Sequence, residues 1–111
     1  MKALTVKPLW AGLIEAGLKT IEVRSRNTRY RGPLVICTSR RSPRDQDDPT
    51  VPKGVTLCIV DLVDSRPMTK ADEAEAGVAY TPGKWAWVVR RPRRITRRPV
   101  RGQLGVFNLT T

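Results

Sequence analysis

The residues with the clearest chemical potential form a short cluster of opposite charges. Lys19, Glu22 and Arg24 fall within six positions, with only Ile21 and Val23 as apolar neighbours. An amine beside a carboxylate suits acid–base or nucleophilic chemistry, whereas cations oriented by a carboxylate suit the binding of phosphate or carbonyl groups. On an exposed strand the same residues would form only a weak surface pair. All three interpretations stay open at this point.

Other catalytic groups are scarce. The sequence contains no histidine, which excludes Ser-His-Asp and Cys-His arrangements and leaves Lys, Glu, Asp, Thr, Ser or Tyr for any catalysis. Cys37 and Cys58 each lie in an apolar run, as buried cysteines do, and the chain has no C-x-x-C motif. The sequence therefore predicts no metal site and no cofactor. Lys19 and Glu22 are the candidate catalytic residues.

Charge is the strongest compositional signal. The 111 residues include 21 Lys and Arg against 10 Asp and Glu, which gives a formal net charge of +11. Nucleic acid is the commonest polyanion that selects such a balance. No apolar run is long enough to cross a membrane and no basic amphipathic helix is evident, so we expect no membrane partner. The first residues lack the pattern of a secretion signal, so we expect a cytoplasmic protein.

Arginines are concentrated in two segments. Residues 88–102 carry seven cations, all arginine, and two prolines that exclude a continuous helix. A guanidinium suits phosphates and base edges better than an ammonium does. A biased genome composition is the alternative explanation, but further arginines in the loop at residues 40–53 favour phosphate binding. We predict an extended or hairpin-like arm and nucleic-acid contacts through Arg40, Arg41, Arg90, Arg91, Arg93, Arg94, Arg97 and Arg98.

The elements that position these residues can be predicted from apolar patterning. Segments rich in Val, Ile and aromatics, fenced by Gly or Pro, predict strands at residues 2–6, 20–24, 33–39, 55–63, 84–89 and 105–109. A helix is expected to begin at Pro8 and end at Gly17, and a second short helix to occupy residues 68–77. The pattern predicts one α+β, mostly β domain: a small barrel of five to six strands with one or two flanking helices.

Alternation along the second predicted strand separates its side chains. It directs Ile21 and Val23 toward the core and Glu22 and Arg24 along the opposite face, with Lys19 at the mouth of a cleft. The charged cluster therefore lines a single surface.

This cluster also resembles a known signature. Gly17, Lys19, Glu22 and Arg24 match G-x-K-x-x-E-x-R, which resembles the motif of the ASCH (activating signal cointegrator homology) domain. The stretches LTVKPLWAGLIEAGLKTIEVR, YRGPLVICTS, WAWVV and GQLGVFNL are similar to that family as well, so the resemblance spans nearly the whole chain. It implies one PUA-like domain over residues 1–111, with a cleft beside the barrel. Family members are described as RNA-associated or nucleic-acid-binding proteins, and some small bacterial relatives as hydrolases or ribonucleases.

Aromatic residues complete the predicted site. The resemblance places Trp10 at the edge of the cleft, where it can stack on a ligand. Tyr30 lies in a predicted turn, from which it can contact a nucleotide or cap the barrel. Trp85 and Trp87 share one strand face, which suits either base stacking or core packing. The predicted ligand cleft comprises Lys7, Trp10, Lys19, Glu22, Arg24 and Tyr30.

Two functions from different classes are compatible with these residues. The first is a nucleic-acid-binding module, with single-stranded or structured RNA as the expected partner. The alternative is a small hydrolase that uses Lys19, either a ribonuclease or an acetylcytidine-type amidohydrolase. The resemblance to such amidohydrolases implies a lysine, a nearby threonine and a distant glutamate. Lys19 matches the lysine and Glu73 or Glu75 would supply the acid, but Glu22 stands where the threonine is expected.

Overall fold

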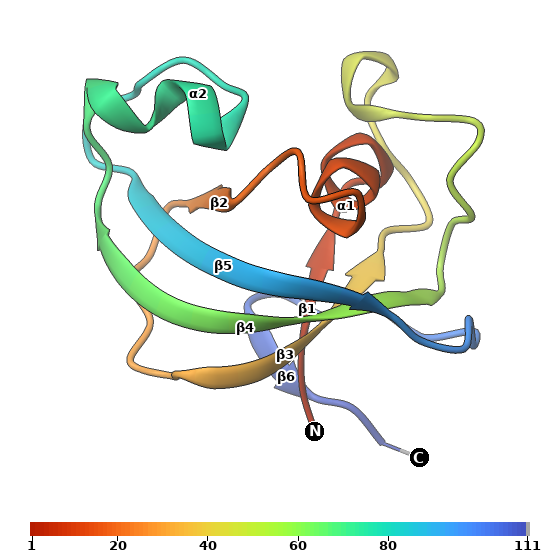
Figure 1. Ribbon diagram of the computed structural model, residues 1–111. Coiled ribbons are helices and arrows are strands. Elements are labelled where there is room, and N and C mark those ends of the chain that lie inside the picture. Colours follow the sequence, from red (N-terminus) through yellow and green to blue (C-terminus); the bar gives the residue numbers. More distant parts are fainter. Residues whose placement is uncertain (111) are drawn as a thin grey trace.

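Residues 1–110 of the computed structural model form a six-stranded mixed sheet and two short α-helices (Figure 1). In chain order the elements are β1 (Lys2–Val6), α1 (Pro8–Glu15), β2 (Ile21–Arg24), β3 (Gly32–Thr38), the 3-10 helix η1 (Arg44–Gln46), β4 (Thr56–Pro67), the 3-10 helix η2 (Lys70–Asp72), α2 (Glu73–Ala76), β5 (Trp85–Arg94) and β6 (Val106–Asn108).

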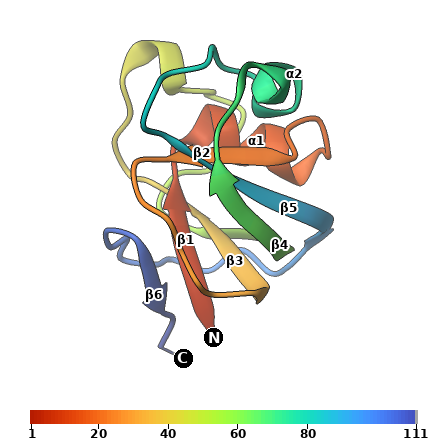
Figure 2. The same cartoon turned by 90° about the vertical axis from the view of Figure 1, so that its left-hand side faces the viewer.

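The strand order in the sheet is β2-β5-β4-β3-β1-β6. β1 pairs in parallel with β3, and the other neighbouring pairs are antiparallel. The sheet curves strongly, and its edges are β2 and β6, so it forms a half-barrel (Figure 2). The predicted α+β fold of up to six strands with two short helices is confirmed.

The main hydrophobic core fills the concave side of the half-barrel, where α1 packs on the sheet (Figure 1). Leu34 and Ile36 of β3 and Val60 and Leu62 of β4 contribute alternate side chains, and Ile14 of α1 closes the cluster from the other side. Strands buried this way favour branched apolar residues, which explains the composition of β3 and β4. The packing fixes α1 beside the end of β1.

β2 is covered on both faces. Ile21 packs with Met68 and Ala76 in a second apolar cluster beneath α2. Glu22 points to the other side and lies opposite Trp87 of β5. The predicted alternation holds for Ile21 and Glu22, and Glu22 is buried rather than solvated, whereas Arg24 on the same face is half-buried.

β5 is longer than the sequence predicts. The apolar pattern ends at Val89, whereas the strand continues past Pro92 to Arg94. The extension contains a β-bulge: the register with β4 shifts between Ile59 and Asp61, and the backbone of β5 adopts a positive φ of 54° just before the proline. Proline is tolerated at such irregularities because a ladder hydrogen bond is missing there.

The second predicted helix is divided into η2 and α2. Thr69 and Asp72 form a capping box at the start of η2, and Gly77 ends α2 in the left-handed conformation. No helix in residues 1–110 is long and apolar enough to cross a membrane.

Candidate functional site

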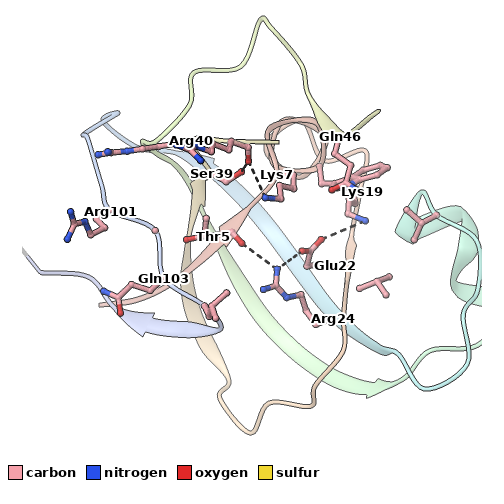
Figure 3. A pocket seen from close by; sticks show the side chains of 16 residues that line it. Thr5, Lys7, Lys19, Glu22, Arg24, Ser39, Arg40, Gln46, Arg101 and Gln103 are labelled. Carbon is pink, nitrogen blue, oxygen red and sulfur yellow. Dashed lines mark hydrogen bonds and ion pairs between the residues drawn. The ribbon is translucent and has the colours of Figure 1, made fainter. Parts of the chain in front are cut away.

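A cleft of about 800 Å³ opens beside β1 and β2 (Figure 3). Its walls are the junction of β1 with α1, the start of β2, the loop after β3 and residues 101–104 before β6. The cleft is lined by five residues of the predicted ligand site, Lys7, Trp10, Lys19, Glu22 and Arg24, and by two of the predicted phosphate-binding residues, Arg40 and Arg41.

Lys19 is the most buried charge of the cleft, with 3% of its surface exposed. Its Nζ donates a hydrogen bond to the carbonyl oxygen of Ala76 in α2, lies 3.9 Å from Oε1 of Glu22 and sits 5.0 Å from the ring centre of Trp10. Burial lowers the pKa of this amine below its usual 10.5, and the nearby Glu22 carboxylate opposes that shift. Lys19 is thus held in the wall of the cleft by the carbonyl of Ala76, the carboxylate of Glu22 and the ring of Trp10.

Glu22 is held between two cations. Its Oε2 accepts a hydrogen bond of 3.1 Å from Nη1 of Arg24, and Lys19 approaches the other oxygen. The same Nη1 lies 3.4 Å from the carbonyl oxygen of Thr5, and the guanidinium stacks 5.9 Å from the ring centre of Trp87. Since Glu22 is only 6% exposed, its charge requires these partners.

Further cations form the rim of the cleft. Lys7 reaches across to donate a 3.1 Å hydrogen bond to the carbonyl oxygen of Arg41. Arg101 and Gln103 approach from the segment before β6, on the opposite side of the opening from Lys19 (Figure 3). In total the lining contains one carboxylate, Glu22, and six cations: Lys7, Lys19, Arg24, Arg40, Arg41 and Arg101.

Several lining residues were missed by the sequence analysis, among them Thr5, Arg101 and Gln103. The glycine at position 102 is the one local hint in the sequence of this close approach. A Cβ added there would lie only 2.9 Å from Oγ1 of Thr5. The contact depends on the pairing of β6 with β1, which no local pattern predicts.

The arginine-rich segment is not a free arm. Residues 88–94 belong to β5, and the end of that strand lies on the far side of the molecule from α2 (Figure 1). Arg91 and Arg93 both bind Asp61 of β4, at 2.8 and 3.0 Å.

Two more arginines of the segment form ion pairs within the fold. Arg94 and Arg97 lie 3.6 and 3.2 Å from Glu15 at the end of α1. Arg90 donates to the carbonyl oxygen of Val89, while Arg98 lines a separate cavity. None of the predicted arginines from 90 to 98 is among the residues that line the cleft.

The remaining predicted aromatics serve the fold. Tyr30, predicted for the ligand site, is not among the residues that line the cleft: its hydroxyl donates to the carbonyl oxygen of Pro33 and its ring packs against the main core. Trp87 is buried in the core, and its indole N–H donates to the carbonyl oxygen of Arg26 at 2.9 Å. Core packing therefore explains this tryptophan, while Trp10 keeps one face toward the cleft.

The carboxylates of α2 do not reach the cleft. Oε2 of Glu73 accepts a 2.6 Å hydrogen bond from the backbone N–H of Tyr80, and Glu75 is exposed to solvent. Neither lines the cleft that contains Lys19. In residues 1–110 no group of three or more His, Cys, Asp or Glu side chains could hold a metal ion.

Comparison with known proteins agrees with this architecture. A family model described as the ASCH domain matches residues 4–98, which include the whole Lys19–Glu22–Arg24 cluster. The chain belongs to the ASCH domain family. No curated protein matches it. The fold of this ASCH domain is similar to the crystal structure of ASCH from Zymomonas mobilis, with 18% identity, a TM-score of 0.65, and coverage of 89% of this chain and 71% of that one.

Two mutant forms of the Zymomonas mobilis protein give the same result. One is 17% identical with a TM-score of 0.66 and covers 88% of this chain and 74% of that one. The other is 16% identical with a TM-score of 0.67 and covers 89% and 73%. At these identities the similarity concerns the fold alone.

Proposed function

We propose that this ASCH domain binds RNA by admitting one unpaired nucleotide into the cleft while the rim cations hold the neighbouring phosphates. The observation that carries the proposal is the combination of a buried Lys19–Glu22–Arg24 cluster with a cationic rim in one cleft of about 800 Å³. A plain phosphate clamp has no use for a buried carboxylate. Membership of a family whose domains are generally associated with RNA supports the same assignment.

The side chains of the cleft offer complementary contacts to a nucleobase. Glu22 can accept a hydrogen bond from an exocyclic amino group, and Lys19 and Arg24 can donate to a base carbonyl or a phosphate oxygen. The ring of Trp10 provides an aromatic surface of the kind on which unpaired bases stack. In this proposal Glu22 and Trp10 recognise the base, Lys19 and Arg24 bind its carbonyl or its own phosphate, and the rim cations hold the neighbouring phosphates.

Ion pairing separates the rim arginines from those of β5. In residues 1–110 no carboxylate forms an ion pair with Arg40, Arg41 or Arg101. In contrast, Arg91 and Arg93 already share Asp61. A phosphate approaching the rim meets unpaired guanidinium groups, whereas at Arg91 and Arg93 it must compete with Asp61.

The test measures the binding of a short single-stranded RNA by fluorescence anisotropy at a series of salt concentrations. Each phosphate contact on a single strand contributes about −0.7 to the slope of log K against log salt. The double variant Arg40→Ala/Arg41→Ala should therefore reduce the slope by about 1.4. Arg91→Ala/Arg93→Ala is the matched control, because it removes the same charge elsewhere, and it should reduce the slope less. An equal or larger effect of the control would assign phosphate binding to β5.

Glu22→Gln tests the base-reading role. At a temperature where both proteins are folded, the variant should change the preference among RNAs that differ in one base and leave the salt slope nearly unchanged. An unaltered preference would contradict the assigned role of Glu22. The RNA, which includes a sample carrying acetylcytidine, is recovered after each assay. Cleavage of the strand or loss of the acetyl group would establish the hydrolase instead, provided that Lys19→Met abolishes it.

A further inference from the structure

Leu104 is the most exposed large hydrophobic side chain among residues 1–110, with 98% of its surface in contact with solvent. The others in this class are Met1, Leu18 and Val63. Of these residues only Leu104 lines the nucleotide cleft. Single exposed leucines are common on protein surfaces, so exposure alone carries no meaning. Its position at the mouth of a cationic cleft is the informative feature.

The segment that carries Leu104 is fixed at both ends. Before it, Pro99 forms a bridge with Val55, and the backbone N–H of Val100 donates 2.9 Å to the carbonyl oxygen of Gly54. After it, β6 pairs with β1. The leucine is thus held out in water by a short anchored loop.

Two glycines set the shape of this loop. Gly102 packs against Thr5 so closely that a Cβ would meet the threonine hydroxyl at 2.9 Å. Gly105 has a φ of +65°, a conformation that favours glycine, and it turns the chain directly after Leu104. The two glycines therefore hold residues 101–104 against one wall of the cleft, with the side chain of Leu104 exposed to solvent.

The neighbours of Leu104 restrict the partner. Arg101 and Gln103 flank it within the lining, and both are exposed. A protein partner would need a wider apolar surface than one side chain surrounded by polar groups. A stacked nucleic acid matches all three residues. Its phosphates can bind Arg101, its base edges can hydrogen-bond to Gln103, and the space between two unstacked bases can hold the single side chain of Leu104.

We propose that Leu104 is a wedge that enters the base stack when a nucleotide leaves it for the cleft. The inference rests on the proposed function and names its substrate: a nucleotide displaced from stacked or paired RNA. Enzymes and architectural proteins that unstack a base must compensate for the lost stacking, and inserted leucines serve this purpose. A flexible single strand has little stacking to lose, so it needs no wedge.

The experiment compares two RNAs, a hairpin and an unstructured strand, each carrying one 2-aminopurine, whose fluorescence rises when the base unstacks. The parent protein should bind both and raise the emission of the hairpin. Leu104→Ala should weaken hairpin binding about tenfold and suppress the rise in emission, with single-strand affinity within about twofold of the parent. Leu104→Met should retain the parent behaviour.

Leu18→Ala is the matched control, because Leu18 is 73% exposed but does not line the cleft. It should leave both RNAs unaffected. Binding of both RNAs with no difference between Leu104→Ala and the parent would overturn the wedge and leave the proposed function standing. Failure of the parent to bind either RNA would overturn both.

Discussion

Replacing Lys19 by Met removes the most buried charge of the cleft. The ammonium is nearly inaccessible, and burial lowers its pKa, so the folded protein disfavours the charged form. Methionine has a similar length and no charge to desolvate. The substitution leaves the carbonyl of Ala76 without its donor, which costs about 1–3 kcal/mol, and removes a desolvation penalty of several kcal/mol. Glu22 keeps its contact with Arg24.

These terms nearly cancel for Lys19→Met. We expect its unfolding free energy to lie within about 1 kcal/mol of the parent value. Glu22→Gln should behave differently, because Lys19 would lose the carboxylate that offsets its burial. Removing one partner of a buried pair leaves an uncompensated charge, so we expect a loss of roughly 2–4 kcal/mol. The two single variants of one ion pair should therefore have unequal effects on stability.

Urea unfolding at several pH values measures both effects. Lys19 releases its proton at a lower pH in the folded protein than in the unfolded chain, where the pKa of its amine has the usual value of 10.5. Between those two pKa values the unfolded state binds more protons, so the unfolding free energy of the parent should rise with pH relative to Lys19→Met. Two results would refute this reasoning: a larger loss of stability for Lys19→Met than for Glu22→Gln, or no rise with pH in the parent. Either one would mean that the attraction between Lys19 and Glu22 outweighs the cost of burying the lysine.

Three further outcomes follow from contacts and burial in other parts of the fold. Asp72 accepts two hydrogen bonds from the half-exposed Arg66, so Asp72→Asn should cost about 1–2 kcal/mol in urea unfolding. The pKa of Asp72 is lowered to about 2, mainly by Arg66, so this contribution should be complete above pH 3.8 and fade as the pH falls toward 2. Burial raises the thiol pKa of Cys37 to about 11 and of Cys58 to about 12, so an aromatic disulfide reagent at pH 8 should react with them only after unfolding. Gly102→Ala should lower the stability in thermal unfolding by roughly 1–2 kcal/mol, because its Cβ would overlap the threonine beneath it.

Local patterning predicted the features that depend on neighbours in sequence. Runs of branched apolar residues between Gly and Pro marked all six strands, and Pro8 and Gly17 marked the ends of the first helical segment. The period of two placed Glu22 and Arg24 on one face because β2 is a regular strand. Those parts of the cleft that lie within one stretch of chain were therefore accessible from the sequence.

Features that depend on distant partners were not accessible. A β-bulge carries β5 past Pro92, and the apolar pattern had ended before that residue. Arg91 and Arg93 find their carboxylate about thirty residues away, at Asp61. The ring of Tyr30 packs against the main core, whose residues come from distant parts of the chain. Each of these outcomes is decided by tertiary packing, which overrides local propensity.

The arginines of this ASCH domain fall into two structural groups that composition alone cannot separate. Arg91 and Arg93 pair with Asp61, and Arg94 and Arg97 pair with Glu15; such exposed pairs contribute little stability individually. Together they hold the end of β5 against β4 and α1, just before the chain turns back toward the cleft. That returning segment delivers Arg101 and Leu104 to the opening. Arg91, Arg93, Arg94 and Arg97 thus tie the end of β5 and the segment after it to the fold, whereas Arg40, Arg41 and Arg101 on the cleft rim form no ion pair within residues 1–110.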